Sequence, residues 1–165
     1  MKPPATHAET SEAMALESRH LFRISITLHP ILEVGDTPLG QRRVVPVSGG
    51  HFSGERLRGE VLEHAGSDLL LGRRDGSFNQ DVRLILRTDD GALILMTYRG
   101  VRHASMDVSA QLARGEWVSP SEYYLRTLPQ FETSAQRYEW LNRIVAVGIG
   151  ERQPDSVTYE VFEIL

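Results

Sequence analysis

The sequence predicts an all-β protein, a single antiparallel up-and-down β-barrel of about eight to ten strands with one short helix. Apolar and polar residues alternate with a period of two over several stretches after residue 20, which is typical of strands with one buried face. Turn-forming glycine, proline and aspartate residues separate these stretches by short connections. No long helical pattern lies between them, which argues against a parallel α/β sheet.

The composition is that of one globular domain. The chain has 165 residues, a net charge of −4 and 41% hydrophobic residues. The absence of cysteine excludes disulfides and thiol chemistry. The acidic balance argues against a nucleic-acid partner, and the longest apolar run, residues 92–96, is far too short for a membrane span.

The N-terminus differs from the rest of the chain. Residues 1–20 hold prolines, alanines and mixed charges but no apolar core of a signal peptide. We therefore expect a flexible arm over residues 1–20, a barrel domain over residues 21–165, and a cytoplasmic protein.

The first half of the barrel domain begins with the clearest alternation. Residues 22–28 carry apolar side chains at every second position, and Pro30 ends that strand. Residues 32–40 are expected to form a loop, and residues 42–47 an edge or irregular strand because Pro46 interrupts them. Two further strands are expected over residues 57–62 and 67–73.

The middle of the chain carries the strongest local signals. Asp90 and Gly91 separate two alternating runs, residues 83–88 and 92–98, which is typical of a β-hairpin. Residues 107–114 predict the short helix, with Asp107 as its N-cap residue and Gly115 at its end.

The last third of the domain contains one ambiguous segment. Thr133 and Gln136 fit a capping box, which would start a helix. Tyr138, Trp140 and Asn142 instead alternate as in a strand. We favour a tight turn followed by a strand over residues 138–149, with further strands over residues 123–127 and 157–164.

A barrel of this size leaves room for one small ligand, so polar residues that point inward are candidates for a site. Burial raises the pKa of a carboxyl group and suits it to proton transfer, and arginine or tyrosine can stabilise negative charge. For each residue taken singly, the solvated outer face of a sheet is the simpler interpretation. The candidate catalytic residues are Asp81, Arg83 and Glu132, and the candidate ligand-binding residues are Asp68, Tyr124, Arg126, Trp140 and Asn142.

Other site types find little support. No two of the six histidines stand at a spacing typical of metal ligands, so we expect no metal site. The chain also lacks a nucleophile elbow, a P-loop and a dinucleotide-binding glycine pattern.

Several segments resemble one known family. The runs GDTPLGQRR at residues 35–43, PVSGG at 46–50 and RTDDGA at 87–92 are similar to those of the Domain of Unknown Function 3237 family, also called uncharacterised protein family 0311. Further matches are LRGEVL at residues 57–62 and WLNR at 140–143.

The resemblance carries its own expectations. It implies a small antiparallel β-barrel, often a homodimer, with no metal or organic cofactor. Some fungal relatives are similar to cofactor-free cyclases that close an oxygen ring onto an alkene by guided proton transfer. Asp68 matches the family pattern, whereas leucines at 69 and 70 replace its tryptophan and glutamine, which implies a more apolar pocket.

Three functions remain open at this point. The first is a cofactor-free isomerase, cyclase or lyase that acts on a small apolar organic molecule. The second is a non-catalytic barrel that binds a small ligand. The third is a structural or interaction protein, for which we expect a barrel interior filled by side chains.

Overall fold

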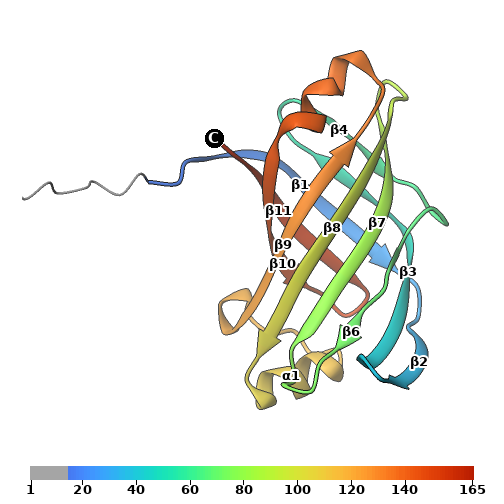
Figure 1. Ribbon diagram of the computed structural model, residues 1–165, viewed down its shortest axis with the longest axis vertical. Helices are drawn as coiled ribbons and strands as arrows, with labels where there is room; N and C mark the ends of the chain where they lie inside the picture. Colours follow the sequence, from blue (N-terminus) through green and yellow to red (C-terminus); the bar gives the residue numbers. More distant parts are fainter. Residues whose placement is uncertain (1–14) are drawn as a thin grey trace, which may run out of the picture.

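The computed structural model describes residues 15–165 and shows a closed antiparallel β-barrel (Figure 1). Strand β1 pairs with both β3 and β11, so the two ends of the sheet meet and eight strands enclose the barrel. The strands are β1 (Ser18–Leu28), β2 (Leu32–Thr37), β3 (Gly40–Ser53), β4 (Arg58–Val61), β5 (Ser67–Asp68), β6 (Leu71–Gly72), β7 (Phe78–Thr88), β8 (Leu93–Ala104), β9 (Tyr123–Glu132), β10 (Val145–Arg152) and β11 (Ser156–Ile164).

Neighbouring strands follow one another along the chain, which confirms the predicted up-and-down topology. The short segments β4, β5 and β6 together fill the place between β3 and β7. In the described part of the chain, three helical segments accompany the barrel, the α-helix α1 (Met106–Ala113) and the 3₁₀ helices η1 (Pro120–Glu122) and η2 (Gln136–Arg143). No helix within residues 15–165 has the length and apolar character needed to cross a bilayer.

Alternation with a period of two builds the core. In β1, Phe22, Ile24 and Ile26 are buried, while the residues between them point outward. Strand β11 repeats the pattern with Tyr159 and Val161. Removing these apolar faces from water is the main driving force for closing the sheet.

The hairpin and the helix confirm the two strongest local predictions. Strands β7 and β8 pair along their length, and Gly91 adopts a φ of 85° in the turn between them. Helix α1 ends before Gly115, whose φ is 75°. The predicted N-cap was wrong, because the Ser105 hydroxyl, and not Asp107, accepts the Val108 N–H at 3.3 Å.

Two strand predictions in the first half need correction. Residues 32–40 form a hairpin and not a loop, because β2 pairs with β3 and the Thr37 hydroxyl donates to the Gly40 carbonyl at 2.8 Å. Strand β3 is a long barrel strand despite Pro46. The β1–β3 ladder shifts register near this proline, so its missing N–H breaks no regular pairing. Residues 67–73 are extended as predicted but divide into β5 and β6.

The favoured interpretation of the ambiguous segment was wrong. Residues 136–143 form the 3₁₀ helix η2, and the following strand starts only at Val145. Tyr138 and Leu141 are its buried residues, and they stand three apart, which is the repeat of a 3₁₀ helix. The alternation of aromatic residues had suggested a period of two that the burial does not follow.

The expected N-terminal arm is only partly described. Residues 1–14 lie outside the described residues, and β1 already begins at Ser18, within the stretch assigned to the arm.

The two ends of the barrel are built differently. In Figure 1, the orange η2 lies at one end and the yellow α1 at the other. Near η2 the interior is filled by three phenylalanines, where the Phe22 ring lies 5.6 Å from the Phe52 ring and 5.9 Å from the Phe131 ring. The end near α1 contains a cavity, and it positions the candidate site.

Candidate active site

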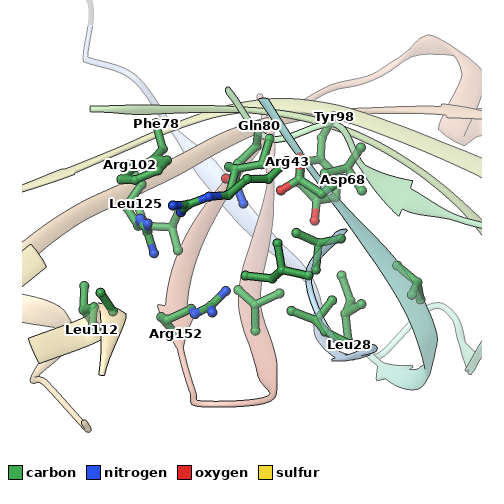
Figure 2. A pocket seen from close by; sticks show the side chains of 18 of the residues that line it. Leu28, Arg43, Asp68, Phe78, Gln80, Tyr98, Arg102, Leu112, Leu125 and Arg152 are labelled. Carbon is green, nitrogen blue, oxygen red and sulfur yellow. The ribbon is translucent and has the colours of Figure 1, made fainter. Parts of the chain in front are cut away.

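A cavity of about 340 Å³ opens at the α1 end of the barrel (Figure 2). Much of its lining is apolar and includes Ile26, Val47 and Val82. Leu112, a buried residue of α1, also lines it. A volume of this size holds a small organic molecule, and the apolar wall favours one with a hydrocarbon or ring body.

Asp68 is the carboxylate within this cavity that burial affects most. It lies on β5, between β3 and β7, and its Oδ1 accepts the Asp81 N–H at 3.1 Å. Burial raises the pKa of Asp68 from 3.8 to about 6, although hydrogen bonds from the Asp81 backbone and the Gln80 side chain act in the opposite direction. A carboxyl group with such a pKa exchanges its proton near neutral pH, as a general acid or base must.

Proton-bearing side chains surround Asp68. The Gln80 amide donates to the Tyr159 hydroxyl at 3.0 Å, and the Tyr98 ring lies 5.4 Å from the Tyr159 ring. Burial raises the pKa of Tyr159 to about 12 and that of Tyr98 well above its usual value. Both phenols therefore stay protonated at neutral pH and remain hydrogen-bond donors.

Three arginines, Arg43, Arg102 and Arg152, also line the cavity. Arg43 forms an ion pair with Glu33 at 3.1 Å. The Arg102 guanidinium lies 4.5 Å from the centre of the Phe78 ring. Burial and the nearby charge of Arg152 lower the pKa of Arg102 to about 10, so it remains protonated at neutral pH.

The predicted pair Asp81 and Arg83 does not reach the cavity. The two side chains form an ion pair at 2.9 Å on the outer face of β7, where both are exposed to solvent. Gln80 and Val82 line the cavity, so the residues between and beyond them point outward. The prediction that Asp81 and Arg83 point into the barrel was wrong, because the inner face of β7 is formed by the residues next to them in the sequence.

Three further candidates, Tyr124, Arg126 and Glu132, lie on the outer face of β9. The buried residues of this strand alternate with them. The Tyr124 ring stacks on His103 with centroids 5.0 Å apart, and the Arg126 guanidinium lies 4.9 Å from the same tyrosine ring. Their expected place in the barrel interior was also wrong, for the same reason of register.

The last two candidates, Trp140 and Asn142, lie on η2, at the end of the barrel away from the cavity. Trp140 packs against the core, and the Arg56 guanidinium lies 3.4 Å from its ring centre. The Asn142 side chain exchanges two hydrogen bonds with the Thr133 backbone, at 2.8 and 2.9 Å. Their positions indicate structural contacts of η2.

Sequence reasoning missed most of the cavity's polar residues, although a signal was present. The apolar residues of a barrel strand mark its inner face, so a polar residue in phase with them also points inward. Gln80 is in phase with Val82 on β7, and Arg102 is in phase with Tyr98 on β8. The other missed polar residues of the lining are Glu33, Arg43, Tyr98, Ser109 and Arg152, and Tyr159 was missed as the hydrogen-bond partner of Gln80.

The two leucines at the family's tryptophan and glutamine positions have different surroundings. Leu70 is buried and lines the cavity, whereas Leu69 is partly exposed. The expectation of a more apolar pocket therefore applies to Leu70.

Within residues 15–165, one group of potential metal ligands lies outside the cavity lining. His29, Glu63 and His64 place their ligand atoms within 4.8 Å of one another. The sequence showed no two histidines at a spacing typical of metal ligands. The fold nevertheless brings His29 close to Glu63 and His64. The His64 side chain is 78% exposed, so the group is an open surface cluster.

Comparison with known proteins identifies close relatives of the sequence. A UPF0311 protein of Rhodopseudomonas palustris is 33% identical over 150 residues, which cover 91% of this chain and 97% of that protein. A UPF0311 protein of Clostridium acetobutylicum is 34% identical over 145 residues, covering 87% and 91%. More distantly, a hydroalkoxylation enzyme of Penicillium herquei is 26% identical over 128 residues, covering 78% and 70%.

Solved structures show the same fold. The crystal structure of the Rhodopseudomonas palustris relative matches with a TM-score of 0.89 at 32% identity, covering 93% of this chain and 100% of that one. A β-barrel-like protein of Acinetobacter baumannii matches with a TM-score of 0.81 at 37% identity, covering 94% and 100%. The family model described as "Protein of unknown function (DUF3237)" matches residues 16–164, and the chain therefore belongs to this family.

Proposed function

We propose that the protein is a cofactor-free enzyme that moves a proton in a small, largely apolar organic molecule bound in the cavity. The reaction class is isomerisation, ring closure or lyase chemistry. The observation that carries this proposal is the position of Asp68, a carboxyl group with a pKa of about 6 in the wall of an open cavity. Perturbed carboxyl groups in cavities are a common mark of acid–base sites.

The neighbouring groups suit this chemistry. In its ionised form Asp68 takes a proton from an acidic O–H or C–H group, and in its protonated form it returns one to carbon. Gln80 lies beside it and favours its ionised form through a hydrogen bond, and the Gln80 amide also donates to the Tyr159 hydroxyl. The proton that leaves one atom of the substrate is returned to another, so the reaction needs no external reactant.

The fungal relative supports one member of this reaction class. Hydroalkoxylation adds an O–H group across a carbon–carbon double bond, so that a C–O bond forms and the adjacent carbon receives a proton. The relative named for this reaction is 26% identical to the chain. An acid–base group beside an apolar cavity is what such a reaction requires.

The cavity also distinguishes between the two alternative functions, a structural protein and a non-catalytic binding barrel. A structural protein needs no internal volume, so the cavity supports a function with small molecules. A non-catalytic binding protein would use the same cavity and would not need a titrating carboxyl group.

The test is solvent exchange in D₂O with a panel of small unsaturated alcohols, phenols and β-diketones. We expect the protein to incorporate deuterium into at least one compound or to convert it, as measured by mass spectrometry. Asp68→Asn should lower that rate by about 10²- to 10⁴-fold. The matched control is Asp81→Asn, which removes a carboxylate from the outer face of β7.

Two outcomes would contradict the proposal. Equal rates for the protein and for Asp68→Asn would remove Asp68 from the chemistry. Saturable binding without exchange or product would instead assign the protein to the non-catalytic binding barrels.

A further inference from the structure

The cavity carries positive charge that proton transfer by Asp68 does not use. Three guanidinium groups and two carboxylates line it, and Arg43 already pairs with Glu33. Within residues 15–165, neither Arg102 nor Arg152 has a carboxylate within 4.0 Å, and neither guanidinium donates a hydrogen bond. The two side chains are partly buried, and each faces the same cavity.

Such an arrangement is costly unless a ligand completes it. A charged group that leaves water loses hydration free energy, and an opposite charge has to compensate for that loss. The charge of Arg152 acts unfavourably on Arg102, so the two guanidinium groups repel each other when the cavity holds no anion. An anion between them would relieve this repulsion, and guanidinium groups bind carboxylates through paired N–H donors.

The surroundings of the two arginines define the rest of the ligand. The Phe78 ring lies against the Arg102 guanidinium, and Leu112 and Leu125 line the same part of the cavity. Figure 2 shows Arg102 and Arg152 on one side of the cavity and Asp68 on the other. A ligand anchored by the arginines would extend across apolar side chains toward Asp68.

We propose that Arg102 and Arg152 form an anion-binding subsite, and that the cavity takes amphipathic organic anions with a carboxylate or phenolate group on an apolar ring body. This inference rests on the proposed function, since it names the substrate class of the same cavity. Arg102 and Arg152 act as binding and orienting residues, and Asp68 keeps the acid–base role.

The experiment compares two probes of the same shape, 2-naphthoate and the neutral 2-naphthamide, by isothermal titration calorimetry at pH 7.5. We expect the protein to bind the anion at least about tenfold more tightly than the amide, as one charge-assisted hydrogen bond provides. Arg152→Gln and Arg102→Gln should each remove most of this preference. Arg152→Lys should restore part of it, because the charge returns without the planar fork.

A matched control comes from the same strand. Arg99 lies on β8, three residues before Arg102, but its side chain is exposed on the outer face. Arg99→Gln changes the net charge by the same amount and should leave the preference unchanged. Thermal unfolding of each variant shows whether it folds. If Arg102→Gln does not fold, the anion preference of Arg152→Gln alone tests the subsite.

The result that overturns the inference is equal binding of the two probes, or no binding of 2-naphthoate, by the unmodified protein. A preference that survives in Arg152→Gln also overturns it. Asp68→Asn separates this inference from the proposed function, because it should retain the anion preference while it loses proton exchange. A normal exchange rate in Asp68→Asn would contradict the proposed function and leave the anion subsite standing.

Discussion

Two aspartates in hydrogen-bond contact illustrate how burial decides what a side chain does. The backbone N–H of Asp81 donates to the Asp68 carboxylate, yet the two side chains lie on opposite sides of the barrel wall. Asp68 loses hydration and its pKa rises to about 6. Asp81 faces solvent beside Arg83, in an exposed ion pair of the kind that contributes little to stability.

The raised pKa makes a prediction about stability. The folded protein holds the Asp68 proton up to about pH 6, whereas an unfolded chain releases it near the ordinary pKa of 3.8. Ionised Asp68 therefore destabilises the fold fully above pH 6, and this penalty disappears as the pH falls from 6 to below 4. We expect Asp68→Asn to raise the free energy of unfolding by roughly 3 kcal/mol at pH 7.5 and by almost nothing at pH 3.5.

Urea unfolding between pH 3.5 and 8 measures this difference. Asp81→Asn serves as the control, because it makes the same chemical change on the outer face. An Asp68→Asn effect that stays constant over the whole pH range would contradict the assigned burial of the carboxyl group.

At the scale of elements, the β7–β8 turn does more than join two strands. The Asp90 carboxylate accepts hydrogen bonds from the Tyr138 hydroxyl and from Arg137, each at 3.0 Å, and from the Thr88 hydroxyl. The Thr88 hydroxyl is the main cause of a lowered pKa of Asp90. The turn thus holds η2 over the end of the barrel that the phenylalanines fill.

We expect Tyr138→Phe to lower the free energy of unfolding by about 1 kcal/mol, because the ring stays buried and one hydrogen bond to Asp90 is lost. Urea unfolding followed by circular dichroism provides the measurement. Arg137 pairs with the same carboxylate, but its own side chain is 70% exposed. Arg137→Gln should therefore lower the free energy of unfolding by less than about 0.5 kcal/mol. The reverse order would show that the ion pair, and not the phenol, fixes η2.

At the scale of the whole molecule, stability and chemistry occupy different ends of one barrel. Phe22 of β1 packs against Phe52 of the neighbouring strand β3 and against Phe131 of β9, so one buried side chain joins three strands at this end. The α1 end keeps open volume and charged groups instead. Dense packing at one end offsets the free-energy cost of the polar cavity at the other.

This division predicts unequal effects of truncation. Phe22→Ala should cost about 3–5 kcal/mol because it leaves a void in a filled core. Leu112→Ala, at the cavity, should cost less because that side chain already faces open volume on one side. Equal losses in chemical denaturation would mean that the cavity end contributes as much to stability as the packed end.

The fold was largely predictable because its signals are local. Period-two alternation in β1, β7 and β8 requires only neighbouring residues, and the turn at Gly91 requires a single positive φ. The prediction failed where distant contacts decide. Strand β2 has no buried face and forms by pairing with β3, and η2 is held by Asp90 from another part of the chain.

The site was far less predictable, for a geometric reason. Asp68 was predicted and lies in the cavity, but Asp81, Arg83 and the β9 candidates point to the opposite side of their strands. A period of two shows that alternate residues lie on opposite faces of a strand, but it does not show which face points into the barrel. An error of one residue therefore exchanges the inner and outer faces completely.

The sequence by itself determined the family, the closed antiparallel sheet and the hairpin order, because hydrophobic periodicity and turn residues act over a few neighbouring positions. Only the tertiary structure decided which polar groups share one cavity. Asp68, Arg102 and Arg152 come from three separate strands, and barrel closure brings them within electrostatic reach of one another. Their pKa shifts arise from that shared burial, which is a property of the closed barrel and of no single segment.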